Sequence, residues 1–321
     1  MSDLQAAAFK DEATAREWLE RELWPNGPVC PHCTSTEGAY KVESDKARPG
    51  LYVCKACAKQ YSVTVGTLFE RSHIPLNKWL MAMHLMSASK KGMSAHQLHR
   101  MLGVSYKTAW FMAHRIREAM REGNVSGPLG GQNKVVEADE TYIGGKESNK
   151  HKVKRQSGKQ GGSGKEAAFA LVERDGKVRS HHVPDVTAKT LRPILEAHID
   201  WRSYLMTDEA GVYKGPGASF MGHGTVNHSI EEYVRGTFWH TNTVENYFSI
   251  LKRGITGTYH HVSQQHLKRY LCEFDFRYNE RAKLGVSDAE RARKAVKGIV
   301  GKRLTYRRTR DQDEAQEAPQ A

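Results

Sequence analysis

The stretch KVVEADETYIGG, residues Lys134 to Gly145, alternates apolar and polar side chains as a buried β-strand does. It carries acidic residues at Glu137, Asp139 and Glu140. Because successive side chains of a strand point to opposite faces, Asp139 and Glu140 must lie on different sides of the sheet. An isolated aspartate in such a stretch is commonly a turn or edge residue. Asp139 gains significance only from the acidic residues that later segments bring to it.

The segments that follow Gly145 predict an α/β domain. In chain order they indicate a β-hairpin over residues 167–183 that turns at Asp175 and Gly176, a helix over 187–199 capped by Thr187, a strand that starts near 203 and ends at Asp208, a strand over 223–230, and a helix over 240–254. This order is compatible with a ribonuclease-H-like sheet. A Gly-rich linker precedes the first strand, and we expect the domain to span residues 126–302.

Three carboxylates of this domain can converge at one edge of the sheet. Asp139 lies on the first strand, Asp208 at the carboxyl end of a later strand, and Glu245 early on the last helix. Such carboxylates supply the hard oxygen ligands with which a pair of Mg²⁺ or Mn²⁺ ions promotes phosphodiester displacement. We therefore expect all three to bind the catalytic metal, whereas Glu140 and Glu209 alternate to the opposite face. Taken singly, Asp208 could merely cap the next turn.

The last helix, HTNTVENYFSILKRG from His240 to Gly254, leaves a second interpretation of Glu245 open. Apolar residues recur along one side of this helix, and Glu245 and Lys252 lie together on a neighbouring side. Asn242 could cap the helix while Glu245 completes a capping box, which would leave Lys252 as a solvated surface charge. The capping and metal-binding uses of Glu245 compete, and we expect metal binding to prevail once metal and DNA are present.

Four cysteines near the amino terminus predict a structural zinc site. Cys30 and Cys33 form one CxxC pair and Cys54 and Cys57 another, separated by a stretch that resembles a short β-hairpin. Four thiolates at this spacing close a tetrahedron around Zn²⁺ and leave no open position for catalysis. A short amphipathic helix over residues 11–27 precedes the site, and we assign residues 1–70 to this zinc ribbon. Zinc ribbons bind DNA or protein, so the motif alone does not choose a partner.

Residues 71–125 predict a helix-turn-helix region. An apolar helix over 76–88 is followed by two helices within residues 94–120, separated by a turn that contains glycine. The second of these helices would present a DNA-contacting outer face, formed by Tyr106, Lys107, Thr108 and Arg115. An ordinary three-helix bundle with a basic surface is the alternative interpretation.

The overall charge favours a nucleic-acid partner. The 321 residues carry a formal net charge of +13, which suits a polyanion such as nucleic acid or an acidic membrane surface. No apolar run is long enough to span a bilayer and the start lacks a secretory signal, so we expect a cytoplasmic, nucleoid-associated protein without a membrane partner. Residues 146–166 read as a basic flexible insertion, either solvated or in contact with the DNA backbone, and residues 303–321 as a disordered tail.

Four motifs together resemble a known family. They are WPNGPVCPHC at 24–33, ADETYIGGK at 138–146, TDEAGVY at 207–213, and HTNTVENYFSILKRGITGTYHHVSQQHLKRYLCEFDFRYNER at 240–281. The sequence resembles bacterial insertion-sequence transposases of the zinc-ribbon, Asp-Asp-Glu type, relatives of the Merlin superfamily, from about residue 18 to 281. The resemblance implies a multidomain protein: a zinc ribbon, a helix-turn-helix, and an α/β ribonuclease-H-like catalytic domain.

The resemblance also implies an activity. It implies a DNA transposase that binds terminal inverted repeats and catalyses metal-dependent strand cleavage and strand transfer, acting as a homo-oligomer on double-stranded DNA. The catalytic residues would be Asp139, Asp208 and Glu245, and Lys252 matches the lysine that follows the third acid. Lys252 could hold the phosphate beside the one that is cut. The alternatives are a DNA-binding regulator with a silent catalytic domain, and a ribonuclease-H-like nuclease without joining activity.

Overall fold

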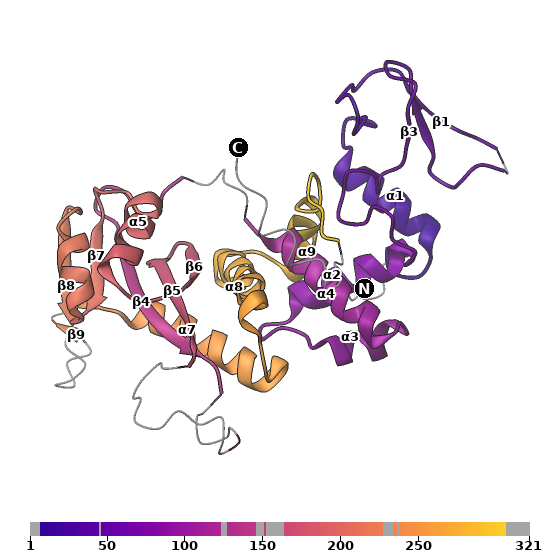
Figure 1. Ribbon diagram of the computed structural model, residues 1–321. Helices are drawn as coiled ribbons and strands as arrows, with labels where there is room; N and C mark the ends of the chain where they lie inside the picture. The colour runs from indigo at the N-terminus through magenta and orange to yellow at the C-terminus, as the bar shows by residue number, and fades with distance from the viewer. Residues whose placement is uncertain are drawn as a thin grey trace, which may run out of the picture. The chain divides into compact units, whose positions relative to one another are not determined.

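The computed structural model divides into two compact units (Figure 1). The described residues are 7–44, 46–122, 127–145, 151, 164–226, 234–235 and 238–305. The first unit comprises the described residues within 7–88, 95–119 and 289–305, and the second those within 89–94 and 120–288. Within the described part of the chain, no helix combines the length and apolar character needed to cross a membrane.

The first unit joins a small sheet to a group of helices. Its elements are η2 (Ala7–Phe9), α1 (Glu12–Leu23), β1 (Ala39–Lys41), β2 (Tyr52–Cys54), β3 (Gln60–Tyr61), α2 (Leu76–Ala88), α3 (Ala95–Leu102), α4 (Tyr106–Met120) and α9 (Asp288–Lys297). The α1 helix starts where the Asp11 carboxylate accepts the amide of Thr14 at 2.8 Å, a side-chain cap of a free helix end. Strands β1, β2 and β3 form an antiparallel sheet, which confirms the predicted hairpin between the cysteine pairs.

The two helices predicted on either side of a glycine turn are α3 and α4. Gly103 adopts a φ of +59°, which suits a residue without a side chain, and the Ser105 hydroxyl caps α4 by accepting the amide of Thr108 at 3.1 Å. The predicted apolar side of α4 is buried, as Met112 and Ile116 demonstrate. The structure therefore contains the helices, while their role as a DNA-binding motif stays a prediction.

The carboxy-terminal helix α9 belongs to the first unit. The Arg291 guanidinium donates to the carbonyl of Ser87 at 3.0 Å, and Lys302 donates to the carbonyl of Glu118 at 3.0 Å. The sequence predicts that the α/β domain runs to residue 302. These long-range hydrogen bonds instead group residues 289–305 with α2 and α4, because the last turns of the chain satisfy backbone carbonyls of those helices.

The second unit is built on one mixed sheet. Its elements are β4 (Val135–Ile143), β5 (Glu166–Glu173), β6 (Val178–Val183), α5 (Ala188–His198), β7 (Tyr204–Asp208), η5 (Gly211–Tyr213), α6 (Lys214–Gly217), β8 (Gly222–Val226), β9 (Val234–Arg235), β10 (Trp239–His240), α7 (Asn242–Gly254), the π-helical η7 (Ile255–Tyr259), α8 (Gln264–Asn279) and η8 (Ala282–Leu284). The strand order is β6-β5-β4-β7-β8, with β4, β5 and β6 antiparallel and β4, β7 and β8 parallel. This is the order of a ribonuclease-H-like sheet.

Two apolar layers cover the two faces of this sheet. On one face, Ala138 of β4 and Leu205 of β7 pack with Leu191 of α5. On the other face, Ala170 of β5 packs with Val244 of α7 and with α8. Each strand therefore sends alternate side chains to α5 and to α7, as the period of two requires.

The outer edge of β6 is hydrogen-bonded by side chains of α8. The Asn279 side chain accepts the amide of Val178 at 2.7 Å and donates to its carbonyl at 3.0 Å. The Asp275 carboxylate accepts the amide of Ser180 at 2.9 Å and the hydroxyl of Tyr247 at 2.6 Å. These contacts fix α8 along the sheet edge and satisfy backbone groups that a neighbouring strand would otherwise bind.

Some sequence predictions fall largely outside the described residues. Of the predicted insertion at 146–166 only 151 and 164–166 are described, and Glu166 already begins β5. Of the predicted tail at 303–321 only 303–305 are described. The strand predicted over 223–230 is β8, which ends at Val226.

Candidate functional site

The four amino-terminal cysteines form a cluster with the dimensions of a zinc site. Their sulfur atoms all lie within 4.8 Å of one another, with Cys30 and Cys57 at 3.7 Å and Cys33 and Cys54 at 3.7 Å. A tetrahedral zinc ion with Zn–S bonds of about 2.3 Å separates its sulfurs by about 3.8 Å. The donor set therefore fits structural zinc.

The backbone of the first knuckle favours a thiolate. Burial disfavours the charged form of Cys30, but hydrogen bonds from the amides of His32 and Cys33 lower its pKa to about 7. Against a hydrogen bond from the Ser35 amide, the neighbouring thiols, Cys57 foremost, raise the pKa of Cys33 to about 12. A low pKa at one sulfur eases metal binding, because zinc is held by deprotonated cysteines. The cluster thus carries both the geometry and the chemistry of a closed structural centre.

The register of the parallel strands places two of the predicted catalytic acids at the same level. Val135 of β4 lies opposite Tyr204 of β7, and Glu137 lies opposite Met206. Asp139 and Asp208 are each two residues beyond that last pair, and Asp208 is the final residue of β7. In parallel strands, residues at matching positions point to the same face. The two aspartates therefore share one face at the end of the strand pair.

That face is the one covered by α7. Ala138 and Leu205 belong to the layer against α5, so Asp139 and Asp208, one and three residues further along, point to the opposite side. Glu245 lies in the first turn of α7, which packs on that side. All three acids are therefore gathered at one region of the sheet.

Neighbouring carboxylates affect the pKa of Asp139. Burial, then the charge of Glu140, and then the charges of Asp208 and Glu245 raise the pKa of Asp139 to about 8, against an opposing hydrogen bond from the Glu140 amide at 2.8 Å. Burial and these neighbouring charges disfavour the ionised form of Asp139, and a bound divalent cation would offset that penalty.

The acids are near one another without forming a closed ligand set. Among the described residues, the cysteine cluster is the one group of three or more metal-binding side chains whose ligand atoms lie within 4.8 Å. The carboxylates of Asp139, Asp208 and Glu245 interact electrostatically at greater separation. Such an open arrangement suits metals that retain positions for water and phosphate oxygens.

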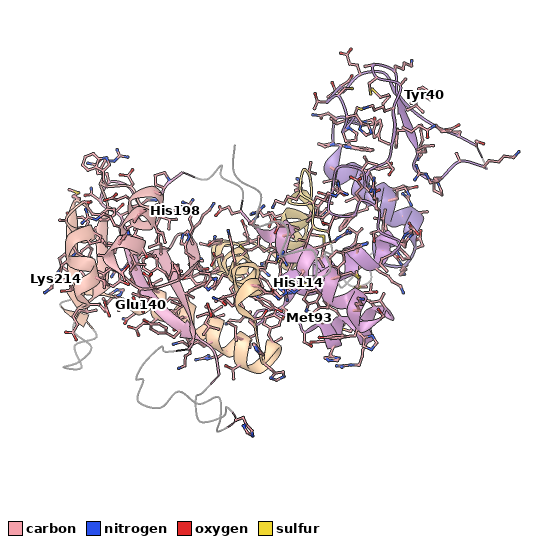
Figure 2. The ribbon with its side chains drawn as sticks, viewed as in Figure 1. Tyr40, Met93, His114, Glu140, His198 and Lys214 are labelled. Atoms are coloured by element: carbon pink, nitrogen blue, oxygen red, sulfur yellow. The ribbon has the colours of Figure 1, made fainter. Side chains whose placement is uncertain are left out.

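The remaining acidic neighbour on β4 points the other way, as predicted. Glu140, labelled in Figure 2, accepts a hydrogen bond from the hydroxyl of Tyr213 on the α5 side. Burial raises the pKa of Glu140. Its alternation from Asp139 is confirmed, and its carboxylate is engaged away from the face of α7.

The start of α7 differs from the predicted capping box. Thr241 precedes the helix and Asn242 is its first residue. The Thr241 hydroxyl donates to the Glu245 carboxylate at 3.0 Å, so Glu245 interacts with Thr241 rather than completing a box with Asn242. The interpretation of Asn242 as the helix cap is therefore wrong. Lys252 lies exposed in the last turn of the same helix, seven residues beyond Glu245.

The acceptor for the first amides of α7 is a residue that sequence reasoning missed. Glu137 is fully buried and accepts the amides of Thr243 at 2.7 Å and of Val244 at 3.0 Å. Its position two residues before Asp139 already indicates that the two side chains lie on the same face of the strand. An acid at an apolar, inward-facing strand position requires a partner, and the sequence did not identify that partner.

The four predicted DNA-contacting residues differ in their exposure to solvent. Tyr106 and Lys107 are exposed at the start of α4, and Thr108 is half-buried beside Ser105. Arg115 does not lie on the outer face: its guanidinium is 4.7 Å from the ring centre of Phe111, and it donates to the carbonyl of Leu304 at 3.2 Å. The outward placement predicted for Arg115 is wrong, because the carboxy-terminal segment covers this side of α4.

Comparison with known families matches both units. Residues 10–60 match the transposase zinc-ribbon domain, and residues 128–279 match the ISXO2-like transposase domain. The chain is therefore similar to two transposase domains, one in each unit. The second match contains Asp139, Asp208 and Glu245, and the first contains all four cysteines of the cluster.

A curated relative is similar to this protein over most of the chain. It is an uncharacterized protein in transposable element ISH50 of Halobacterium salinarum, 28% identical over 294 residues that cover 84% of this chain and 91% of the relative. A solved chain in the cryoEM structure of a simian T-cell lymphotropic virus intasome, in complex with PP2A regulatory subunit B56 gamma, is 16% identical. That match covers 59% of this chain and 66% of the viral chain at a TM-score of 0.28.

Proposed function

We propose that this chain binds the terminal inverted repeats of an insertion sequence and catalyses metal-dependent DNA strand cleavage and strand transfer. The observation that supports this most directly is the shared face of Asp139 and Asp208, with Glu245 on the helix that covers it. The match to an ISXO2-like transposase domain agrees with this chemistry. A Merlin relationship and a bacterial source belong to the same proposal.

The reaction exchanges phosphodiester bonds. Water attacks the phosphorus at the element's end, which releases a 3′-hydroxyl and leaves a 5′-phosphate. That 3′-hydroxyl then attacks a phosphodiester of target DNA, so one ester replaces another and no nucleotide cofactor is consumed. Mg²⁺ or Mn²⁺ held by Asp139, Asp208 and Glu245 would stabilise charge on the attacking and leaving oxygens.

The other residues of the proposal bind DNA. Lys252 follows Glu245 by seven residues, about 10 Å along a helix, which suits an ammonium that holds a flanking phosphate. Tyr106, Lys107 and Thr108 at the start of α4 would contact the inverted repeat. We include a homo-oligomer on paired DNA ends in the proposal, since joining two ends to one target requires more than one active site.

The decisive experiment uses a labelled inverted-repeat end with Mg²⁺. Asp139→Asn should lower cleavage by at least about a thousandfold, as losses of direct catalytic groups do, while binding of the end persists. Glu209→Gln is the control, because Glu209 is an exposed acid beside Asp208. Full strand transfer by the Asp139 variant would reject the assignment. Cleavage without joining by the wild type would favour the nuclease, and binding without cleavage the regulator.

A further inference from the structure

We infer that Glu137 is a positioning residue that joins β4 to the start of α7 and thereby sets Glu245 against Asp139 and Asp208. The inference rests on the proposed function, in which these three acids bind the catalytic metal. Glu137 and Asp139 are two residues apart on one strand face, and Glu245 directly follows the helix residue Val244 that Glu137 binds. One carboxylate thus connects the two elements that carry the first and third acids.

The first contact is with the free amino end of α7. Early amides of a helix lack partners within the helix, and a carboxylate stabilises both their hydrogen bonds and the positive end of the dipole. Glu137 accepts the amides of Thr243 and Val244 with one oxygen, at 2.7 and 3.0 Å. The residue before the helix, Thr241, directs its hydroxyl to Glu245 instead. The acceptor for these amides therefore comes from the strand.

The second contact is an ion pair with Arg174. Its Nε donates to the other oxygen of Glu137 at 2.6 Å, and its two terminal nitrogens donate to the carbonyls of Phe238 and His240, both at 2.8 Å. The same guanidinium thus holds the segment that leads into α7. A buried ion pair is stabilising only when its hydrogen bonds are complete, and these meet that condition.

These contacts assign Glu137 a supporting role rather than metal binding. One of its oxygens accepts from Arg174 and from the Thr243 hydroxyl, at 2.6 and 2.8 Å, and the other accepts the two helix amides. Its side chain is fully buried, with 0% exposure. A carboxylate with both oxygens occupied in this way holds the helix in place.

The test compares Glu137→Gln with the wild type by two readouts. The first is hydrogen exchange of peptides covering residues 241–247, which requires no activity. Loss of the charged acceptor should speed exchange of these amides about tenfold, the effect of losing one hydrogen bond to a charged group. The second is the Mn²⁺ concentration that half-saturates DNA-end cleavage, which should rise about tenfold or more, as for other groups that orient metal ligands.

Glu173→Gln is the matched control. Like Glu137, Glu173 accepts hydrogen bonds from a cationic side chain and from a backbone amide. The donors are the ammonium of Lys134 at 2.6 Å and the amide of Gly130 at 3.0 Å. Those partners lie away from α7, so this variant should change neither readout. Thr243→Ala removes one hydroxyl bond to Glu137 and leaves the charge, so it should shift both readouts in the same direction by less.

The outcomes separate the two proposals. A folded Glu137→Gln protein with wild-type exchange at 241–247, or with wild-type Mn²⁺ dependence, would overturn the inference. If that variant does not fold, unchanged readouts in Thr243→Ala would overturn it equally. Cleavage that survives in Glu245→Gln would reject the proposed metal site, whereas the exchange readout would still report the contact between strand and helix.

Discussion

Asp139 and Asp208 occupy matching positions on adjacent parallel strands, each two residues beyond the pair formed by Glu137 and Met206. The offset between the strands is fixed by the hydrogen-bonded register, so neither aspartate can slip to the other face without breaking the ladder. Their separation is therefore set by the backbone of the sheet, while the position of Glu245 depends on how α7 is held.

The raised pKa of Asp139 predicts a pH-dependent stability difference. Its folded pKa of about 8 exceeds its unfolded value near 4, so the folded protein keeps this proton across that window while the unfolded chain loses it. The free energy of unfolding therefore falls as pH rises from 4 to 8, and Mg²⁺ should restore it. Asp139→Asn should match the wild type near pH 4 and exceed its stability at pH 8 by a few kcal/mol, in urea unfolding without Mg²⁺. Equal stabilities at pH 8 would contradict the burial argument.

Zinc removal should unfold the ribbon selectively. A structural zinc ion in such a small domain supplies on the order of 10 kcal/mol of folding free energy. After chelation, amides within residues 28–65 should lose their protection from hydrogen exchange, while amides of β4 and β5 keep theirs. Cys54→Ser should reproduce the effect without chelator. Protection that persists in a protein shown to be zinc-free would exclude a structural role for the metal.

Gly254→Ala should destabilise the packing of α7 on α8. An added methyl group would lie 2.4 Å from the Phe274 ring and 2.7 Å from the carbonyl of Lys91, both too close to accept it. Overpacking of this kind costs about 1–3 kcal/mol. Gly257→Ala is the control, because no atom lies within 4 Å of its added methyl. Thermal unfolding of both variants measures the difference, and similar melting temperatures would contradict the close approach.

Lys107 and Arg115 should respond differently to alanine substitution, although both are basic residues of α4. Lys107→Ala should weaken binding across DNA sequences and reduce the slope of log affinity against log salt by about 1. Arg115→Ala should lower the melting temperature, because it removes the contacts with Phe111 and with the carbonyl of Leu304. A changed salt slope in the Arg115 variant, with unchanged stability, would contradict its inward placement.

Local patterns predicted much of this fold. The alternation of residues 134–145, the turn at Asp175 and the cap at Thr187 depend on neighbours in the chain, and the structure confirms each of them. The cysteine spacing likewise predicted a cluster that fits zinc. Period and capping rules succeed here because the forces they describe act over a few residues.

Long-range contacts account for what the sequence did not predict. The acceptor at the start of α7 is Glu137, 106 residues before Thr243, so a local capping rule chose Asn242 instead. Arg115 was placed outward because helical periodicity contains no information about Leu304, 189 residues away. The placement of residues 289–305 with the first unit depends on similarly distant hydrogen bonds.

The cover that α8 provides along β6 limits how copies of this chain can associate. Backbone groups of Val178 and Ser180 are already occupied by Asn279 and Asp275, so an incoming strand finds no ladder to join at that end. Continuous intermolecular sheets cannot start there. Any contact that another chain makes at this border is therefore made by side chains, which leaves β6 paired with β5 in its own register.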